Sequence, residues 1–159
     1  MANKTLVAVF SASGVTKRVG QEIARISGGD FFEIVPVEKY TNADLNYMNS
    51  RSRSSVEMND PSARPAIAGR VSDMDAYDTV IIGFPIWWGE EPRIMDTFVE
   101  SYNFDGITMI PFCTSGGSGI GRSGQNLSDN AGSGSWLEGA RFDGDVSEDE
   151  LRSWIEGLK

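Results

Sequence analysis

The fold of this chain is decided by the stretch Leu6-Val7-Ala8-Val9-Phe10-Ser11-Ala12-Ser13-Gly14-Val15-Thr16. Its first half is an apolar run typical of a buried β-strand, and its second half is a cluster of hydroxyl side chains with one glycine. Apolar residues then recur at helical spacing to about residue 27, where Gly28 and Gly29 end the pattern. The stretch therefore predicts a strand, a tight loop and a helix.

The loop between that strand and that helix is a candidate anion site. The first backbone N–H groups of a helix have no partner within the helix, and the helix dipole adds partial positive charge there. Ser11, Ser13 and Thr16 would surround this point with hydroxyl groups. The loop contains no lysine, which excludes the phosphate loop of nucleoside triphosphatases and leaves neutral donors suited to a single phosphate. An ordinary side-chain N-cap is the alternative interpretation.

Strand and helix patterns alternate along the rest of the chain. Strands are expected at about residues 5–10, 31–35, 79–84, 107–113 and 136–142, and helices at about 15–27, 42–53, 92–102, 119–130 and 148–158. This alternation predicts an α/β fold, a doubly wound open sheet of five parallel strands with helices on both faces. No linker or internal repeat interrupts residues 1–159, so a single domain is expected.

Two further loops leave the ends of expected strands. Pro85-Ile86-Trp87-Trp88-Gly89 carries two tryptophans, and Thr114-Ser115-Gly116-Gly117-Ser118 carries almost no bulky side chain. Ligands of a doubly wound sheet bind beyond the carboxyl ends of its strands, so the three loops are expected to meet at one edge. A phosphate site, an aromatic surface and accessible backbone N–H groups suit a flat phosphorylated heterocycle, and with one phosphate loop FMN fits better than a dinucleotide.

A second glycine pattern, Gly119-Ile120-Gly121-Arg122-Ser123-Gly124, matches the dinucleotide-binding fingerprint in letters. That fingerprint follows the first strand of its fold, whereas this one follows the fourth expected strand. The dinucleotide interpretation is therefore disfavoured.

Composition narrows the chemistry further. With 23 acidic and 14 basic residues the net charge is −9, which disfavours nucleic acid as a partner and favours basic partner proteins, unless the charge serves solubility alone. The chain has no histidine, the commonest general base and metal ligand, so no catalytic residue and no metal site are expected. Its single cysteine, Cys113, is interpreted as a core residue, and it permits no internal disulfide. No apolar run approaches the roughly 18 residues of a membrane span, and we expect a cytoplasmic protein.

These loops resemble those of a known family. Ser11-Ala12-Ser13-Gly14-Val15-Thr16 resembles the [ST]-x-[ST]-G-x-T phosphate loop of flavodoxins, and Trp88-Gly89-Glu90-Glu91 is similar to a Trp-Gly-acid-acid loop found in several of them. Residues 114–118 lie where that family has its third flavin loop, and the Pro-Ile-Trp-Trp-Gly loop resembles one flavodoxin-like branch. Length, strand order and acidity agree over essentially the whole chain.

The resemblance implies an FMN site made from all three loops. The residues implied to bind FMN are Ser11, Ala12, Ser13, Gly14, Val15, Thr16, Pro85, Ile86, Trp87, Trp88, Gly89, Thr114, Ser115, Gly116, Gly117 and Ser118. The first loop would hold the phosphate and the third would meet the pyrimidine edge. Trp88, or failing that Trp87, would stack on the isoalloxazine, with Gly89 near flavin N5. Flavodoxins commonly carry a tyrosine in the third loop, and residues 114–130 contain no aromatic residue. The second flavin face is therefore open, or covered by Tyr47, Met48 or a partner chain.

The function implied is that of an FMN-binding electron carrier that shuttles electrons between redox partner proteins. Glu90 and Glu91 would then lower the flavin potential and dock on basic reductases. The alternative is an FMN-dependent NAD(P)H:quinone-type oxidoreductase, motivated by the open flavin face and by the arginines of residues 51–70. A module of this fold that has lost its cofactor is a third hypothesis, and the intact hydroxyl loop argues against it.

Overall fold

The computed structural model describes residues 4–12, 14–46, 48–87, 89–115, 117 and 119–158. Its main sheet has the order β2-β1-β5-β6-β7, with β8 also paired to β6, and all of these pairs are parallel. The strands are β1 (Thr5–Val9), β2 (Asp30–Glu33), β5 (Thr79–Pro85), β6 (Thr108–Thr114), β7 (Ser135–Trp136) and β8 (Ala140–Phe142). The order differs from the order along the chain at β1, where the winding reverses. The predicted α/β class with a parallel central sheet is confirmed.

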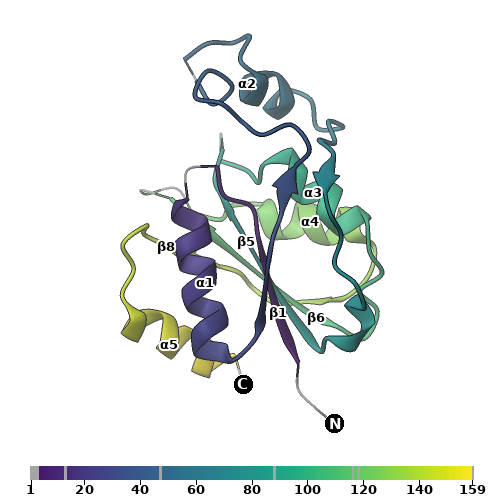
Figure 1. Ribbon diagram of the computed structural model, residues 1–159, viewed down its shortest axis with the longest axis vertical. Helices are drawn as coiled ribbons and strands as arrows, with labels where there is room; N and C mark the ends of the chain where they lie inside the picture. Colours follow the sequence, from purple (N-terminus) through teal and green to yellow (C-terminus); the bar gives the residue numbers. More distant parts are fainter. Residues whose placement is uncertain are drawn as a thin grey trace.

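Burial on both faces of the sheet explains why its strands read as continuous apolar runs. Successive side chains of a strand point to opposite faces, so residues 6, 8 and 10 join one hydrophobic cluster and residues 7 and 9 join the other. Helices α3 (Arg93–Glu100) and α4 (Ser123–Ala131) cover the first cluster, and α1 (Val15–Ser27) and α5 (Glu148–Gly157) cover the second (Figure 1). The central strands are thus shielded from water by both helix layers.

Two helix ends lie where capping residues in the sequence predicted them. Helix α1 ends at Gly28, whose φ of 72° is left-handed and whose N–H donates to the carbonyl of Ala24. The N-cap of α5 is Ser147, whose hydroxyl accepts the N–H of Glu150 at 3.2 Å. These two ends depend on residues within one helical turn, which is why sequence reasoning finds them.

Two expected elements are wrong. The expected helix at residues 42–53 is absent from the described part of that range, where turns give way to the short α2 (Arg53–Met58), whose N-cap is Ser52. The expected last strand is split into β7 and β8, whose registers on β6 differ by one residue. The split lies opposite Pro111, which has no N–H to give to a neighbouring strand.

A lobe formed by residues 37–66 leaves the main body at a small antiparallel pair, β3 (Val35–Pro36) with β4 (Ile67–Ala68). It rises beyond the carboxyl ends of β1 and β5 (Figure 1). Within the lobe, Arg53 lies 3.9 Å from the ring centre of Tyr40 and donates to Glu57 at 2.8 Å. A short 3-10 helix, η1 (Met74–Ala76), then leads into β5. Among the described residues, no helix is both long enough and apolar enough to cross a membrane.

Candidate functional site

The three loops leave the carboxyl edge of the sheet, as expected. Strands β1, β5 and β6 are adjacent and parallel, so they end at the same edge. Two contacts hold the ends of these strands together. At the end of β1, Phe10 donates its N–H to the carbonyl of Gly83 on β5 at 3.0 Å. At the end of β5, Pro85 lies opposite Thr114 of β6. Each loop therefore starts next to another.

A buried hydroxyl pair ties the first loop to the third. Oγ1 of Thr16, in the first turn of α1, lies 2.7 Å from Oγ1 of Thr114 at the end of β6. The two residues are 2% and 5% exposed. Because each hydroxyl can both donate and accept, the pair satisfies two polar groups that would otherwise be costly to bury.

Residues of all three loops line one cavity of about 480 Å³. The predicted site residues on its wall are Val15, Thr16, Pro85, Thr114 and Ser115. The remaining wall is formed by residues 143–145, which sequence reasoning missed. The signal that could have found them is positional, because they follow the last parallel strand at the same edge of the sheet.

The N-terminus of α1 has the donor set that a phosphate needs. Its N-cap is Gly14 at φ 94°, no side chain of a described residue caps it, and no acidic residue lies in its first turn. The described residues therefore do not support the interpretation of this loop as a side-chain N-cap. The N–H of Gly14 donates to the hydroxyl of Ser11 at 2.9 Å. The backbone N–H groups that follow, in the first turn of α1, have no partner within the helix and point out of its N-terminal end. Neutral donors at a positive helix end fit a phosphate monoester. Ser13 lies outside the described residues.

Two residues at the start of the first loop, Ser11 and Ala12, face a different cavity. Ser11 and Ala12 lie on the wall of a cavity of about 290 Å³, together with Lys17, Lys39 and Tyr40 among others. The first loop therefore stands between two hollows, and the structure does not bring Ser11 and Ala12 to the same cavity as Thr16.

The second loop contains a tight turn. Trp87 and Glu90 exchange backbone hydrogen bonds of 2.9 and 3.0 Å, and Gly89 between them has φ 78°, a left-handed value that favours glycine. The indole of Trp87 packs edge-on against Phe10 and Tyr40, with ring centres 5.7 and 5.3 Å away. Trp87 is thus part of the packing between the sheet and the lobe. Pro85 and Ile86 are partly buried, and Trp88 lies outside the described residues.

The third loop is held by an arginine that sequence reasoning missed. Arg141 on β8 donates from Nε to the hydroxyl of Ser115 at 3.0 Å and from Nη2 to its carbonyl at 2.9 Å. The same guanidinium binds Asp143 at 2.5 Å, which offsets the negative charge of that cavity wall. Gly117 is exposed, with no atom within 4 Å of a Cβ built on it. Gly116 and Ser118 lie outside the described residues.

One expectation about the acidic pair after the second loop is wrong. Glu91 is 1% exposed, so it cannot dock on a partner protein, whereas the side chain of Glu90 is 41% exposed. Burial, followed by the hydrogen bond that protonated Glu91 donates to the Asp96 carboxylate, raises the pKa of Glu91. A neutral Glu91 would not lower a flavin potential by its charge.

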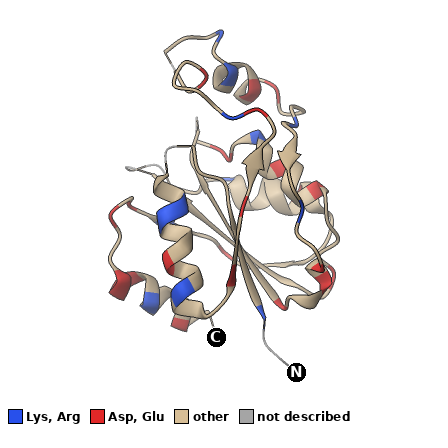
Figure 2. Cartoon of the chain, viewed as in Figure 1, with Lys and Arg blue, Asp and Glu red and all other residues tan. Residues whose placement is uncertain are grey.

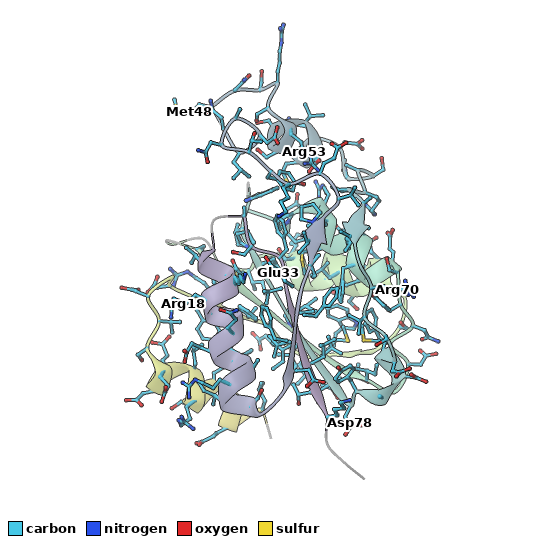
Figure 3. The ribbon with its side chains drawn as sticks, in the orientation of Figure 1. Arg18, Glu33, Met48, Arg53, Arg70 and Asp78 are labelled. Carbon is cyan, nitrogen blue, oxygen red and sulfur yellow. The ribbon has the colours of Figure 1, made fainter. Side chains whose placement is uncertain are left out.

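Tyr47 and Met48 of the lobe are the residues that the sequence suggested as a cover for the second flavin face. Met48 is 83% exposed and stands at the outer end of the lobe (Figure 3), and Tyr47 lies outside the described residues. Three of the arginines of residues 51–70 are used within the chain. Arg53 binds Glu57, and the other two, Arg64 and Arg70, bind the Glu100 carboxylate and the Ser101 carbonyl. These three arginines are therefore paired within the chain.

The single cysteine of the chain lies in the core. Cys113 is fully buried, and burial raises the pKa of its thiol to about 11, as expected of a core residue. Among the described residues, no group of three or more His, Cys, Asp or Glu side chains could hold a metal ion.

Comparisons with known proteins place the chain in a family. The sequence profile of the family described as flavodoxin matches residues 4–158. The chain is similar to the structures of two proteins classed as flavoproteins. The one from Bacteroides eggerthii is 44% identical, with a TM-score of 0.92 over 99% of this chain and 98% of that one. The one from Bacteroides uniformis is also 44% identical, with a TM-score of 0.92 over 98% and 99%.

A flavoprotein from Lactobacillus acidophilus, solved in complex with FMN, is 22% identical and has a TM-score of 0.73 over 97% of this chain and 99% of that one. A search of curated proteins finds no match to the sequence. The profile covers nearly the whole chain, and two structures at 44% identity cover it as fully. The chain therefore belongs to the flavodoxin family.

Proposed function

We propose that this chain is an FMN-binding electron-transfer protein that shuttles electrons between redox partner proteins. FMN is the cofactor, as supported by the flavodoxin family profile and by the FMN complex of the Lactobacillus acidophilus flavoprotein. The observation that carries the proposal is the cavity of about 480 Å³ at the uncapped end of α1, with predicted residues of all three loops on its wall.

The proposed site assigns a task to each loop. The first loop, residues 11–16, binds the phosphate through the N–H groups of α1 and its hydroxyls. The second, residues 85–89, lies against the isoalloxazine, with Gly89 near N5. Because Trp87 is already packed between Phe10 and Tyr40, we assign the stacking role to Trp88, in a loop of the Pro-Ile-Trp-Trp-Gly branch. The third, residues 114–118, meets the pyrimidine edge. Bound FMN supplies the redox chemistry, and the chain binds and orients it.

Charge supports protein partners. A net charge of −9 attracts basic reductases and acceptors, although Figure 2 shows acidic residues spread over many elements. The single buried thiol is in keeping with a cytoplasmic location.

One observation favours the alternative, an FMN-dependent NAD(P)H:quinone-type oxidoreductase. No described residue of the third loop is aromatic, and Met48 is exposed, which supports a flavin face accessible to a small substrate. Against it, three of the arginines that suggested a nicotinamide site are occupied within the chain.

The test combines binding with reduction. The apoprotein is titrated with FMN and with riboflavin, and a phosphate site predicts that FMN binds at least about tenfold more tightly. Stepwise photoreduction of the holoprotein should then accumulate a one-electron-reduced flavin. Equal affinity for both flavins would refute the phosphate assignment. Direct two-electron bleaching, with steady turnover of reduced nicotinamide and a quinone in the absence of a partner protein, would favour the oxidoreductase instead.

A further inference from the structure

A buried carboxyl pair lies directly behind the turn of the second loop. Glu91 and Asp96 are each 1% exposed, and their side chains are hydrogen-bonded to each other. Two carboxylates have no proton to donate to each other, so this contact requires one of the two groups to be protonated. The pair therefore holds one proton.

The surroundings of the pair favour the proton on Glu91. Asn130 donates from Nδ2 to Asp96 Oδ1 at 2.9 Å, which stabilises a carboxylate at Asp96. Burial, followed by the contact with Asp96, raises the pKa of Glu91 to about 8. At pH 7, Glu91 is then neutral and Asp96 carries one negative charge. The pair gains a second negative charge in mildly alkaline solution.

The two cations that face the pair, Arg64 and Arg93, oppose the rise that burial causes in the pKa of Asp96, and both already have hydrogen-bond partners of their own. The charged groups that face the pair are Glu90 from its own loop, Arg93 from α3, Asp129 from α4 and Arg64 from the segment before β4. The guanidinium of Arg93 donates to the carbonyls of residues 57 and 58 at 3.3 and 2.9 Å and lies 3.5 Å from the Glu90 carboxylate. Arg64 binds both oxygens of Glu100 at 2.9 Å.

The pair is connected to the turn through α4. Nδ2 of Asn126 donates to Oε2 of Glu90 and to Oε1 of Glu91, at 3.2 Å each. Glu90 closes the turn with Trp87, and a Cβ on Gly121 would lie 3.2 Å from the carbonyl of Gly89. The position of the turn against the segment that follows the third loop thus depends on side chains that Glu91 helps to hold.

We propose that Glu91 is a positioning residue of the flavin site, and that the proton it shares with Asp96 holds the turn of residues 87–90 in place. This proposal rests on the proposed function, since it places the turn beside FMN. When the proton leaves, two adjacent carboxylates repel each other in a site shielded from water, and the contact through Asn126 weakens. FMN therefore binds the protonated protein more tightly, and its affinity falls as pH rises.

The experiment compares wild type with Glu91→Gln and the control Asp129→Asn. Glutamine keeps an acceptor for Asn126 and a donor for Asp96 but has no proton to lose. Glu91, Asp96 and Asp129 all line one cavity of about 260 Å³. Asp129→Asn removes one charge from the wall of that cavity, where Asp129 accepts a hydrogen bond from Gln125 at 2.8 Å. Thermal unfolding of each apoprotein and FMN titrations are measured from pH 6 to 9.5.

In wild type and Asp129→Asn, we expect the unfolding midpoint to fall as pH rises from 6 to about 8 and to level off above it, because folded Glu91 keeps its proton up to that pH. The Kd for FMN should rise by about tenfold between pH 7 and 9, the limit for one linked proton. Both changes should be absent from Glu91→Gln. Because FMN's own phosphate titrates identically in all three proteins, it cancels from the comparison.

Three outcomes overturn the proposal or part of it. The shared proton is refuted if the unfolding midpoint of Glu91→Gln follows pH as wild type does. The coupling is refuted if the unfolding profiles differ as expected but the ratio of the two Kd values stays constant with pH. If none of the proteins binds FMN at any pH, the proposed function fails and the coupling with it, while the unfolding profiles alone still decide whether the proton is shared.

Discussion

Replacing Gly89 by alanine tests the turn of the second loop. Gly89 has φ 78°, and a Cβ built on it meets no atom within 4 Å, so the substitution acts on the backbone and not through a clash. A left-handed conformation costs an L-residue roughly 1–2 kcal/mol. Restriction of the unfolded chain returns about 0.4–1 kcal/mol, which leaves a net cost of about 1 kcal/mol.

Gly28→Ala is the matched control. Gly28 has φ 72° and an equally open Cβ position, but it ends α1 at the opposite edge of the sheet (Figure 1). Its cost should appear wholly as a fall of about 2–4 °C in the unfolding midpoint of the apoprotein. The turn at Gly89 is exposed, so it can relax in the apoprotein and must be restored when FMN binds. Part of the same cost should then appear as weaker binding, by up to about fivefold in Kd.

The assay is quenching of FMN fluorescence during titration, together with thermal unfolding of each apoprotein. The reasoning is refuted if Gly89→Ala matches wild type in both measurements. It is equally refuted if Gly28→Ala loses as much FMN affinity as Gly89→Ala, because the loss would then be a general effect of destabilisation.

Other substitutions have direct expected outcomes. Thr16→Val leaves the buried threonine hydroxyl on β6 without its 2.7 Å partner and should destabilise the apoprotein by about 1–3 kcal/mol, whereas Thr16→Ser should retain most of the stability, both measured by denaturant unfolding. Gly83→Ala places a Cβ 2.1 Å from the ring of buried Phe112 and should cost roughly 1–3 kcal/mol or more, while Gly117→Ala, with an open Cβ position, should change stability by about 0.5 kcal/mol or less. Cys113 should resist a thiol reagent at pH 8 in the native protein and react once denaturant is added; a fast native reaction would contradict its burial.

Sequence patterns predicted the elements whose causes are local. The bounds of α1 follow from its apolar spacing and from Gly28, and the capping box of α5 lies within a single turn. The lobe of residues 37–66 was not predicted, because its turns are made by short polar contacts that leave no periodic pattern. The split of the last strand was also missed, since it depends on a proline in the neighbouring strand β6.

Part of the candidate site could likewise be predicted from the sequence, and part could not. Its loops were found because hydroxyl and glycine clusters at strand ends are visible in the sequence, and a parallel sheet brings strand ends together. Arg141 was missed because its partner Ser115 is 26 positions away and nothing near Arg141 marks it. Glu90 and Glu91 were treated alike because they are adjacent in the sequence, yet one is partly exposed and the other is buried with a raised pKa.

The sequence by itself determined the opening strand, loop and helix, and through them an anion site, because hydrogen bonds at a helix end involve residues only a few positions apart. Only the tertiary structure decided how that loop is completed. It joins Thr16 to Thr114 across 98 positions, and it turns Glu91 inward onto Asp96. Such pairs form where elements meet, and burial there sets their charge, so neither the pairing nor the protonation can be predicted from the residues on either side.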